Sequence, residues 1–407
     1  MTPGSTDTSE VVILGGGAAG LSLAYHLART SAVPLTLVEQ PDGPQRPAER
    51  TWCYWSEDAT ELAGAVSASW SRLRVYGPDG RDVTVGATPL TYRMVRSTSF
   101  ERMVHSCLER SPAGRVLRAT AGEVRDVPGG AEVRCTPPGG SPLTLRARWV
   151  FDSRPLPVLP PARTHLLQHF RGWFVRTAAE RFDPTVAVLM DFRVPQPDHG
   201  LAFGYVLPLA ADRALVEYTE FSRAPSTTEA YEVALGHYTR EVLGLGAFTV
   251  DSAEQGVIPM TDARFPRRTG RAVYRIGTAG GATRPSTGYT FAAVQRQSRA
   301  IAAALRDGRE TMPPPHGRRA LAMDAVLLRA LDTGRVDGPT FFTDLFRRTP
   351  APRLLRFLDG ATSLREEWSI GLRTPVGPML RTAVEVPFLP RRAHRAHTDP
   401  RTGVPRR

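Results

Sequence analysis

A glycine-rich turn near the N-terminus restricts the possible folds of this chain more than any other segment. Residues 11–14 form a short apolar run, which is typical of a strand buried on both faces of a parallel sheet. The turn at 15–20 follows, and residues 21–29 have the pattern of a helix. A second apolar run at 35–38 ends in Glu39. The order of strand, turn, helix, strand and terminal acid predicts a Rossmann-type dinucleotide site.

Each residue of this motif has a physical role. Gly15 permits the tight turn, Gly17 lets the backbone approach a pyrophosphate, and Gly20 lets helix and strand pack closely. Ala18 lies in the turn before the helix, whose free N–H groups and positive dipole end favour a phosphate. We expect Glu39 to accept hydrogen bonds from a ribose hydroxyl. The motif alone does not distinguish NAD from FAD.

A second glycine-rich segment favours FAD. An apolar run at 274–277 leads into a turn and then into a helix at about 289–306. In many flavoproteins a distant segment of this kind closes over the ribityl chain of the cofactor, although an ordinary loop is the alternative here. The candidate cofactor residues of this segment are Gly277, Gly280, Gly281, Thr287 and Gly288.

The rest of the chain divides by composition and periodicity. We predict an α/β fold in which a discontinuous, Rossmann-type FAD-binding domain joins a β-sheet substrate domain and C-terminal helices. Strand patterns at 186–192, 201–207 and 215–221 indicate the substrate domain. The predicted boundaries are 10–155 and 271–310 for the two parts of the FAD-binding domain, 156–270 for the β-rich substrate domain, 311–390 for a helical region that completes it, and 391–407 for a basic, disordered tail.

Charge and cysteine content narrow the choice of partners. The 407 residues contain 52 arginines and no lysine against 40 acidic residues, for a net charge of +12. This excess predicts attraction to anionic lipid or nucleic acid, or reflects biased base composition in the coding sequence. No nucleic-acid-binding module is visible, so we predict no nucleic-acid partner.

Three scattered cysteines fit neither a disulfide framework nor a metal cluster. Together with the acidic N-terminus, this indicates the cytoplasm. The most apolar stretch, 11–27, is too short and too rich in glycine for a spanning helix.

Many short segments along residues 11–375 form one further pattern. They are Arg50–Cys53, Tyr92–Val95, Phe151–Pro155, Gln168–Trp173, Met190–Arg193, Tyr205–Pro208, Val216–Thr219, Glu254–Met260, Gly277–Gly281, Arg284–Tyr289 and Leu355–Gly360. Their number and order resemble the lycopene cyclase family of flavoproteins, which make the rings of cyclic carotenoids. The resemblance implies formation of β-rings at both ends of lycopene, giving gamma- and beta-carotene. It also implies a reduced FAD used without net redox turnover, with NADPH as the electron source.

One position separates this family from other flavoproteins. Flavin hydroxylases usually carry an aspartate after the glycine of the second FAD segment, and this chain has Thr278 after Gly277. The substitution favours a cyclase over an oxygen-activating monooxygenase. The alternatives are a monooxygenase or polyprenyl reductase of the same fold, which would consume NADPH in proportion to product. A non-catalytic carotenoid- or flavin-binding protein is an alternative of another class.

Ring closure requires protonation of an alkene, a very weak base, so the acid must be a neutral and desolvated carboxyl group. The resemblance places a functional carboxylate in the Val216–Thr219 segment, at Glu217. Independently, Leu215, Glu217 and Phe221 share one face of an extended strand, where burial would raise the pKa of the carboxyl. An ion pair with an arginine at a sheet edge is the alternative interpretation of Glu217.

Other candidates have less certain roles. Glu254 is the second carboxyl candidate, either as the base or as a partner that supports the site. Asp152 follows a buried strand and either contacts the edge of the flavin or organises its domain. His165 and His169 are four residues apart, but no neighbouring carboxylate or cysteine completes a metal site, so we predict no metal.

The substrate implied by the resemblance is long, apolar and dissolved in a bilayer. A chain without a spanning helix must reach it from the surface, so we predict a protein peripheral to the cytoplasmic membrane. Apolar helical faces at 321–331 and 341–346, flanked by arginines, are predicted to contact lipid. The alternative is that these helices form part of the core. Lycopene and related linear carotenoids and the membrane surface are thus the expected partners, and the oligomeric state is left open.

Overall fold

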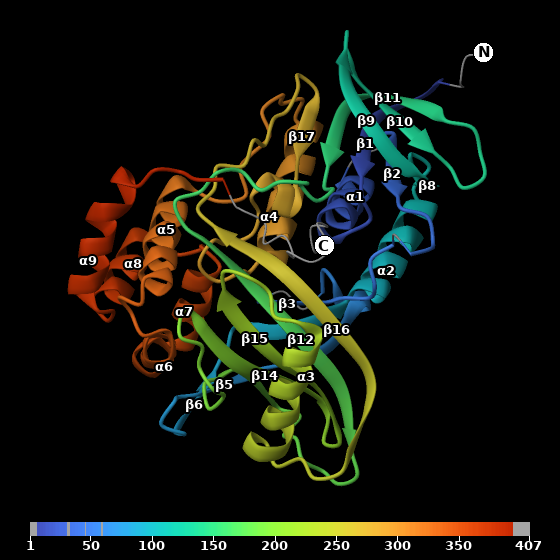
Figure 1. Cartoon of the computed structure of the whole chain (residues 1–407). Helices are drawn as coiled ribbons and strands as arrows, with labels where there is room; N and C mark the ends of the chain where they lie inside the picture. Colours follow the sequence, from blue (N-terminus) through green and yellow to red (C-terminus); the bar gives the residue numbers. More distant parts are fainter. Residues whose placement is uncertain (1–5, 31–32, 45, 58–59, 394–407) are drawn as a thin grey trace, which may run out of the picture.

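Two large sheets, a small sheet and a group of C-terminal helices make up the fold (Figure 1). The computed structural model describes residues 6–30, 33–44, 46–57 and 60–393. Most of the basic tail predicted at 391–407 lies outside the described residues. The fold class predicted from the sequence is confirmed: an α/β fold with mixed sheets ends in a run of helices.

The first sheet contains the predicted dinucleotide motif. Its core strands run parallel because each pair is joined by a crossover, and the apolar run at 11–14 is fully buried at its centre. The parallel strands are β8 (Gly114–Arg118), β2 (Leu35–Glu39), β1 (Thr6–Leu14), β11 (Leu143–Asp152) and β17 (Val273–Arg275), and the antiparallel edge is formed by β10 (Gly130–Thr136) and β9 (Thr120–Val127).

Three helices pack with this sheet. Helix α1 (Ala18–Thr30) lies against α4 (Phe291–Arg306), and His26 Nε2 is 3.0 Å from Gln295 Oε1 between them. Helix α2 (Ser97–Glu109) was not predicted, although Phe100, Val104 and Leu108 recur every fourth residue and are all buried. The helix pair α1 and α4 therefore joins the two predicted parts of the FAD-binding domain.

The second sheet has the order β16-β12-β15-β14-β13-β5-β6 and is antiparallel except between β13 and β5. The strands are β16 (Phe248–Thr261), β12 (His165–Thr177), β15 (Arg213–Ser222), β14 (Leu201–Ala210), β13 (Val186–Asp191), β5 (Arg72–Tyr76) and β6 (Asp82–Gly86). The strands β5 and β6 come from within residues 10–155, yet they extend this sheet. The interval predicted as the first part of the FAD-binding domain thus also supplies strands to the substrate sheet.

The two faces of the second sheet are covered differently. A three-stranded sheet of β3 (Thr51–Ser56), β7 (Thr91–Arg96) and β4 (Val66–Trp70) covers one face, where Trp70 Nε1 donates to the carbonyl of Pro208 at 3.1 Å. Helix α3 (Thr228–His237) and the π-turn at Tyr238–Val242 cover the other. The buried His169 ring on that side contacts Tyr231, which makes it a core histidine.

The C-terminal helices are α5 (Arg318–Asp332), α6 (Gly338–Arg348), α7 (Ala351–Leu358), α8 (Leu364–Gly371) and α9 (Val376–Glu385). The prediction that the faces at 321–331 and 341–346 contact lipid was wrong. Leu328, Phe342 and Phe346 are at most 2% exposed and pack in the core shared with the second sheet. Periodicity identified apolar faces correctly, but it does not reveal whether protein or lipid covers them.

Candidate functional site

The turn after β1 has the geometry that a pyrophosphate requires. Gly15 has a φ of +99°, which favours glycine, and a Cβ at Gly20 would overlap the carbonyl oxygen of Gly15. A Cβ at Gly17 would meet no atom within 4 Å. Helix α1 begins at Ala18, so its first free N–H groups lie beside this open position. The turn can therefore receive an anionic group at the helix N-terminus.

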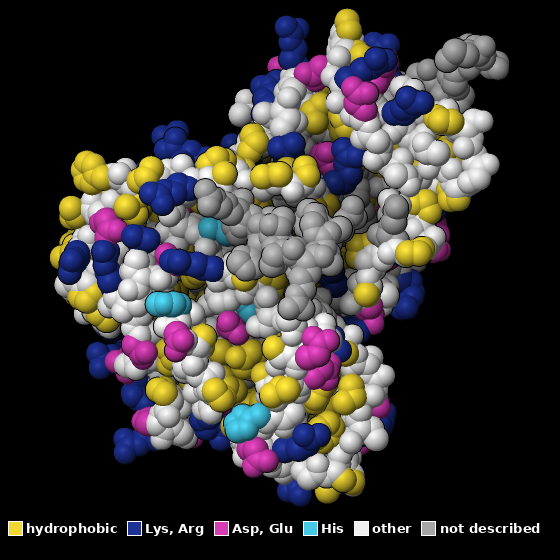
Figure 2. Space-filling view, in the orientation of Figure 1, with side chains coloured by type: hydrophobic (Ala, Val, Ile, Leu, Met, Phe, Trp, Pro, Cys, Tyr) yellow, Lys and Arg dark blue, Asp and Glu magenta, His cyan; other side chains and the backbone are white. Residues whose placement is uncertain are grey.

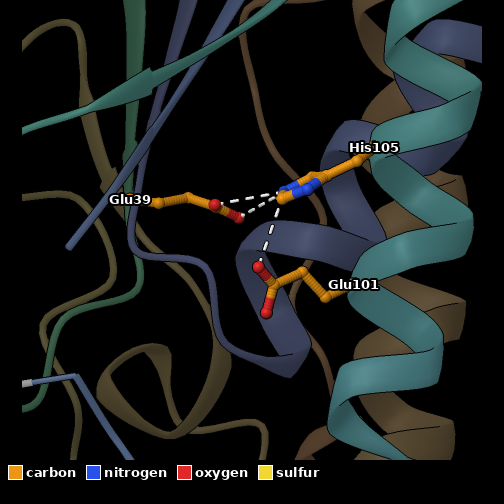
Figure 3. Close-up of side chains that lie close together, drawn as sticks. All are labelled: Glu39, Glu101 and His105. Atoms are coloured by element: carbon orange, nitrogen blue, oxygen red, sulfur yellow. Dashed lines mark hydrogen bonds and ion pairs between the residues drawn. The ribbon is translucent and has the colours of Figure 1, made fainter. Parts of the chain in front are cut away.

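Glu39 ends β2 beneath this turn and is only 2% exposed. Its two carboxylate oxygens each lie 3.1 Å from Nε2 of His105 on α2 (Figure 3). A Cβ at Gly16 would come within 2.6 Å of Glu39 Oε1, so the carboxylate reaches the backbone of the turn. Its position is thus compatible with the predicted ribose contact, which stays a prediction.

The carboxylates around His105 are balanced by arginines. Glu101 lies one helical turn before His105, and its Oε1 is 3.9 Å from the same imidazole nitrogen. Figure 3 shows both side chains directed toward each other. Arg118 lies 3.1 Å from Glu39 and 3.2 Å from Glu101, and Arg46 pairs with Glu101. Two guanidinium groups therefore already supply the positive charge that a cation between these carboxylates would bring.

The second glycine-rich segment lies against the first. A Cβ at Gly277, which has a φ of +64°, would come within 2.6 Å of the Ala19 Cβ at the start of α1. The hydroxyl of Thr287 is buried and has no hydrogen-bond partner among the residues that the structure describes. A buried donor without a partner is costly, so this hydroxyl fits a polar ligand such as a ribityl chain. The remaining predicted residues of this segment, Gly280, Gly281 and Gly288, lie in the same turns.

The second glycine-rich segment is attached to helix α5 by buried polar contacts. Arg284 is 2% exposed, and its guanidinium donates to Asp324 of α5 at 2.8 Å. The hydroxyl of Ser286 donates to the same carboxylate oxygen at 2.7 Å. A buried charge pair with an additional hydrogen bond holds the segment to α5.

Asp152 lies at the carboxyl end of β11, opposite Leu14 of β1 and Arg275 of β17. Its carboxylate accepts two hydrogen bonds from the Arg154 guanidinium, at 2.9 and 2.8 Å. Ligands of open α/β sheets bind outside the carboxyl ends of the strands, where Asp152 stands. The structure thus places Asp152 and the glycine turn at one edge of the sheet.

Glu217 and Glu254 lie in one row across the second sheet. Each of them pairs with Gly172 of the central strand β12, from β15 on one side and β16 on the other. The two Cα atoms are thus about 10 Å apart, twice the spacing of neighbouring strands. A Cβ at Gly172 would lie 2.9 Å from Leu215 Cδ1 and 3.4 Å from the Glu217 Cβ, so the glycine itself places no side chain between the carboxyl groups.

Glu217 is held as a neutral acid. It is 8% exposed, and Leu215 and Phe221 of the same strand face lie in the core around it, as the alternation predicted. Burial, and secondarily the charge of Glu254, raises the pKa of Glu217 to about 8. The hydroxyl of Thr219 donates to its Oε1 at 2.7 Å. Among the described residues, no arginine forms an ion pair with Glu217. The alternative interpretation, an ion pair at a sheet edge, therefore does not apply to these residues.

Glu254 has a different environment. The hydroxyl of Thr51 donates to its carboxylate at 2.8 Å, and the Arg96 guanidinium lies 3.5 Å away. Burial raises its pKa, while the Thr51 hydrogen bond and the charge of Arg96 oppose that shift. A carboxyl group supported by two donors suits a base better than an acid.

An aromatic cluster lies beside the carboxyl row, and it includes Trp55, which the sequence suggested either for a polyene tunnel or for the core. Tyr205 pairs with Glu217 across β14 and β15, and its hydroxyl is 2.7 Å from that of Tyr92. Burial raises the pKa of the neighbouring Cys53 thiol to about 12, which keeps it protonated. Trp55 contacts the ring of Tyr289 at a centroid distance of 4.7 Å. The strand pattern at 201–207 predicted that Tyr205 lies on a strand. Its pairing with Glu217 could not be predicted, because it depends on which strands are neighbours in the sheet.

The carboxyl row adjoins the second glycine-rich segment. A Cβ at Gly288 would overlap Oε1 of Gln168, which is on the same face of β12 as Gly172. Gly172 is four positions along the strand from Gln168, or about 13 Å. The second glycine-rich segment and the carboxyl row therefore lie over the same face of β12.

Comparison with known proteins identifies relatives over nearly the whole chain. A model of the family described as lycopene cyclase protein matches residues 10–384. A lycopene beta-cyclase of Pseudescherichia vulneris is 26% identical over 387 residues, covering 91% of this chain and 95% of the relative. An uncharacterized carotenoid cyclase of Deinococcus radiodurans is 28% identical over 391 residues, covering 88% of each.

Solved structures share the fold at low sequence identity. A geranylgeranyl bacteriochlorophyll reductase-like protein of Thermoplasma acidophilum has a TM-score of 0.61 and 14% identity, with 95% of this chain and 100% of that chain covered. A flavin-dependent monooxygenase solved with FAD and substrate has a TM-score of 0.59 and 15% identity, with 90% and 72% covered. These likenesses support the fold, which several classes of flavoprotein share.

Proposed function

The chain belongs to the lycopene cyclase family, and we propose that it closes the linear ends of lycopene into β-rings, giving gamma- and beta-carotene. The observation that carries this proposal is Glu217, a buried carboxyl that burial keeps protonated at neutral pH beside an aromatic cluster. An acid of this kind is what protonation of an alkene needs. The overall reaction is an isomerisation, because the proton added to the polyene is balanced by the ring proton lost.

The proposed reaction has three steps. The neutral carboxyl of Glu217 gives its proton to the terminal double bond, which leaves a tertiary cation on the neighbouring carbon. The next double bond of the chain attacks that cation and closes the ring. Loss of a ring proton then forms the ring double bond. The aromatic faces of Trp55 and Tyr289 would stabilise the cation, and the surrounding side chains exclude water that would trap it.

Glu254 is the carboxyl group that we propose to take the ring proton, or to support the acid by its charge. It lies on the same face as Glu217, with only Gly172 between them. Its hydrogen bonds to Thr51 and its position near Arg96 favour the ionised form that a base needs.

We propose that FAD binds at the two glycine-rich segments. Gly15, Gly17 and the start of α1 would hold the pyrophosphate, Glu39 a ribose and Thr287 the ribityl chain. A reduced, anionic flavin would supply a fixed negative charge near a cation, with NADPH as the proposed source of electrons.

The proposal is tested by expressing the chain in bacteria that accumulate lycopene and separating the pigments by chromatography. We expect beta-carotene and the one-ring intermediate. Purified enzyme should then form many products for each NADPH oxidised. Oxidation of one NADPH for each product would instead favour a reductase or monooxygenase, and FAD-loaded protein that leaves lycopene unchanged would favour a binding protein.

The raised pKa of Glu217 predicts a pH dependence. The acid is active when protonated, so the rate should be constant at neutral pH and fall as the pH rises through about 8. The measurement is the initial rate of ring formation against pH, with substrate in detergent micelles and flavin content checked at each pH. A rate that increases between pH 7 and 9 would contradict the assignment of a carboxyl acid in this environment.

Replacing Glu254 with glutamine should shift that profile. The substitution removes a like charge that raises the pKa of Glu217, so the alkaline fall in rate should begin at lower pH. The rate at neutral pH should also fall if Glu254 takes the ring proton. Glu232→Gln, which alters an exposed carboxylate on α3 paired with Arg171, is the matched control and should leave the profile unchanged. An unshifted profile in Glu254→Gln would show that the two carboxyl groups are not coupled.

A further inference from the structure

The last two helices expose large apolar side chains at every fourth residue. The series is Leu364, Trp368, Leu372, Val376, Leu380, Val384 and Phe388, with exposed fractions from 43% to 85%. It runs along α8, α9 and the short 3₁₀ turn at Val386–Phe388. These seven are more than half of the thirteen large apolar side chains that are exposed in the described part of the chain. We call this series the apolar stripe.

Helix α9 is attached to the protein mainly by polar contacts, with Met379 also packed against the core. Thr382 is the one buried residue of α9 among those described. The Thr382 hydroxyl accepts a hydrogen bond from the Arg335 guanidinium at 3.2 Å. Glu385 pairs with Arg329 at 2.9 Å and also with Arg335. A surface helix normally turns its apolar face to the core, whereas α9 packs Met379 there but turns Leu380 and Val384 outward. An exposed apolar face of this extent indicates a surface that binds a partner.

The charges beside the apolar stripe are positive. Arg365 and Arg381 are exposed and make no ion pair with any residue that the structure describes. The acidic groups of the same segment are already neutralised, because Glu366 pairs with Arg356 and Glu367 with Arg319. Figure 2 shows yellow and dark blue side chains interspersed over the end of the molecule where α9 lies.

We propose that the apolar stripe and the two exposed arginines beside it, Arg365 and Arg381, dock the protein on an anionic lipid surface. Apolar residues on one face, with Trp368 and Phe388 among them and arginines beside them, are the features of helices that lie in the membrane interface. No helix among the described residues is long and apolar enough to cross a bilayer. A second copy of this chain fits less well, since a symmetric contact of this face would bring the unpaired arginines of the two copies together.

The docking surface adds a source of substrate to the proposed function. The statement that the bilayer supplies the substrate rests on that proposed function, whereas the docking itself does not. Lycopene dissolves in lipid, so an enzyme resting on the membrane by α8 and α9 would take it from there. The surface itself is inferred from exposure and charge alone.

The experiment is co-flotation of the FAD-loaded protein with vesicles of phosphatidylcholine, with and without phosphatidylglycerol. We expect strong binding that requires the anionic lipid and weakens as salt rises. The variant Leu380→Ser/Val384→Ser/Phe388→Ser should bind at least about tenfold more weakly. The matched control is Val158→Ser/Val233→Ser/Val250→Ser, which removes three exposed apolar side chains elsewhere and should bind like the unaltered protein.

The outcomes separate the docking surface from the chemistry. Flavin content and the unfolding temperature of both variants should match those of the unaltered protein. The stripe variant should keep ring formation from lycopene in detergent micelles and lose it from lycopene in vesicles. Unaltered binding by the stripe variant would overturn the proposal, as would a dimer that this variant alone dissociates. Strong vesicle binding with no ring formation in either medium would refute the proposed function and leave the docking surface standing.

Discussion

Glu217→Gln should lower the rate of ring formation by roughly 10³-fold or more, the scale of losing a positioned acid. Glutamine has the same shape as the neutral carboxyl and keeps an oxygen that can accept from Thr219, but its amide has no acidic proton to give. Because burial already holds Glu217 uncharged, the substitution removes no buried charge and should leave the fold intact. The measurement is product formation from lycopene in micelles, with flavin content as the check on folding.

The matched control for this experiment is Glu220→Gln on the same strand. Glu220 pairs with His169 of β12 on the opposite face of β15, where its carboxyl lies 3.9 Å from the His169 ring. Burial also raises the pKa of Glu220, so the control is a second partly desolvated carboxyl outside the row. It should keep near-normal turnover. Normal turnover in Glu217→Gln would show that another group is the acid, and Glu254 would be the next candidate.

Gly20→Ala should produce the largest effect on the cofactor. The added Cβ overlaps the carbonyl oxygen of Gly15, and backbone on both sides cannot yield as a flexible side chain would. We expect a destabilisation of about 3 kcal/mol, typical of overpacking at a rigid contact, and a loss of bound flavin of at least about tenfold. Thermal unfolding and the flavin absorbance of the purified protein measure the two effects.

Gly17→Ala separates the fold of the turn from its contact with the cofactor. A Cβ at Gly17 meets no atom of the protein within 4 Å, so the apoprotein should unfold at an unchanged temperature. If the pyrophosphate approaches the backbone here, flavin affinity should nevertheless fall. Full flavin retention in Gly17→Ala would place the pyrophosphate elsewhere.

The parts of the site that could be predicted from the sequence are those set by neighbouring residues. The glycine turn depends on local φ angles and close packing within one strand–turn–helix unit, and the face shared by Leu215 and Phe221 depends only on the period of two in a strand. The burial of Glu217 on an apolar strand face followed from that alternation. Its chemical role remains a prediction.

The row that joins Glu217 to Glu254 could not be predicted in this way. It depends on the register of β12 with β15 and with β16, and only that register makes Gly172 the common neighbour. The parallel pairing of β5 with β13 is likewise long-range. The lipid contact predicted for 321–331 and 341–346 failed for a related reason. Periodicity identifies an apolar face, but the contacts that bury Phe342 and leave Leu380 exposed belong to the tertiary structure.

The buried pair of Arg284 and Asp324 has a consequence for exchanging parts between flavoproteins of this fold. Its arginine belongs to the second glycine-rich segment and its aspartate to α5, so a natural or engineered recombination near residue 310 would separate the two. A chimaera that inherits only one of them would carry an uncompensated charge in its interior, at a cost of about 3–5 kcal/mol. The second glycine-rich segment and α5 would therefore have to be exchanged as one unit.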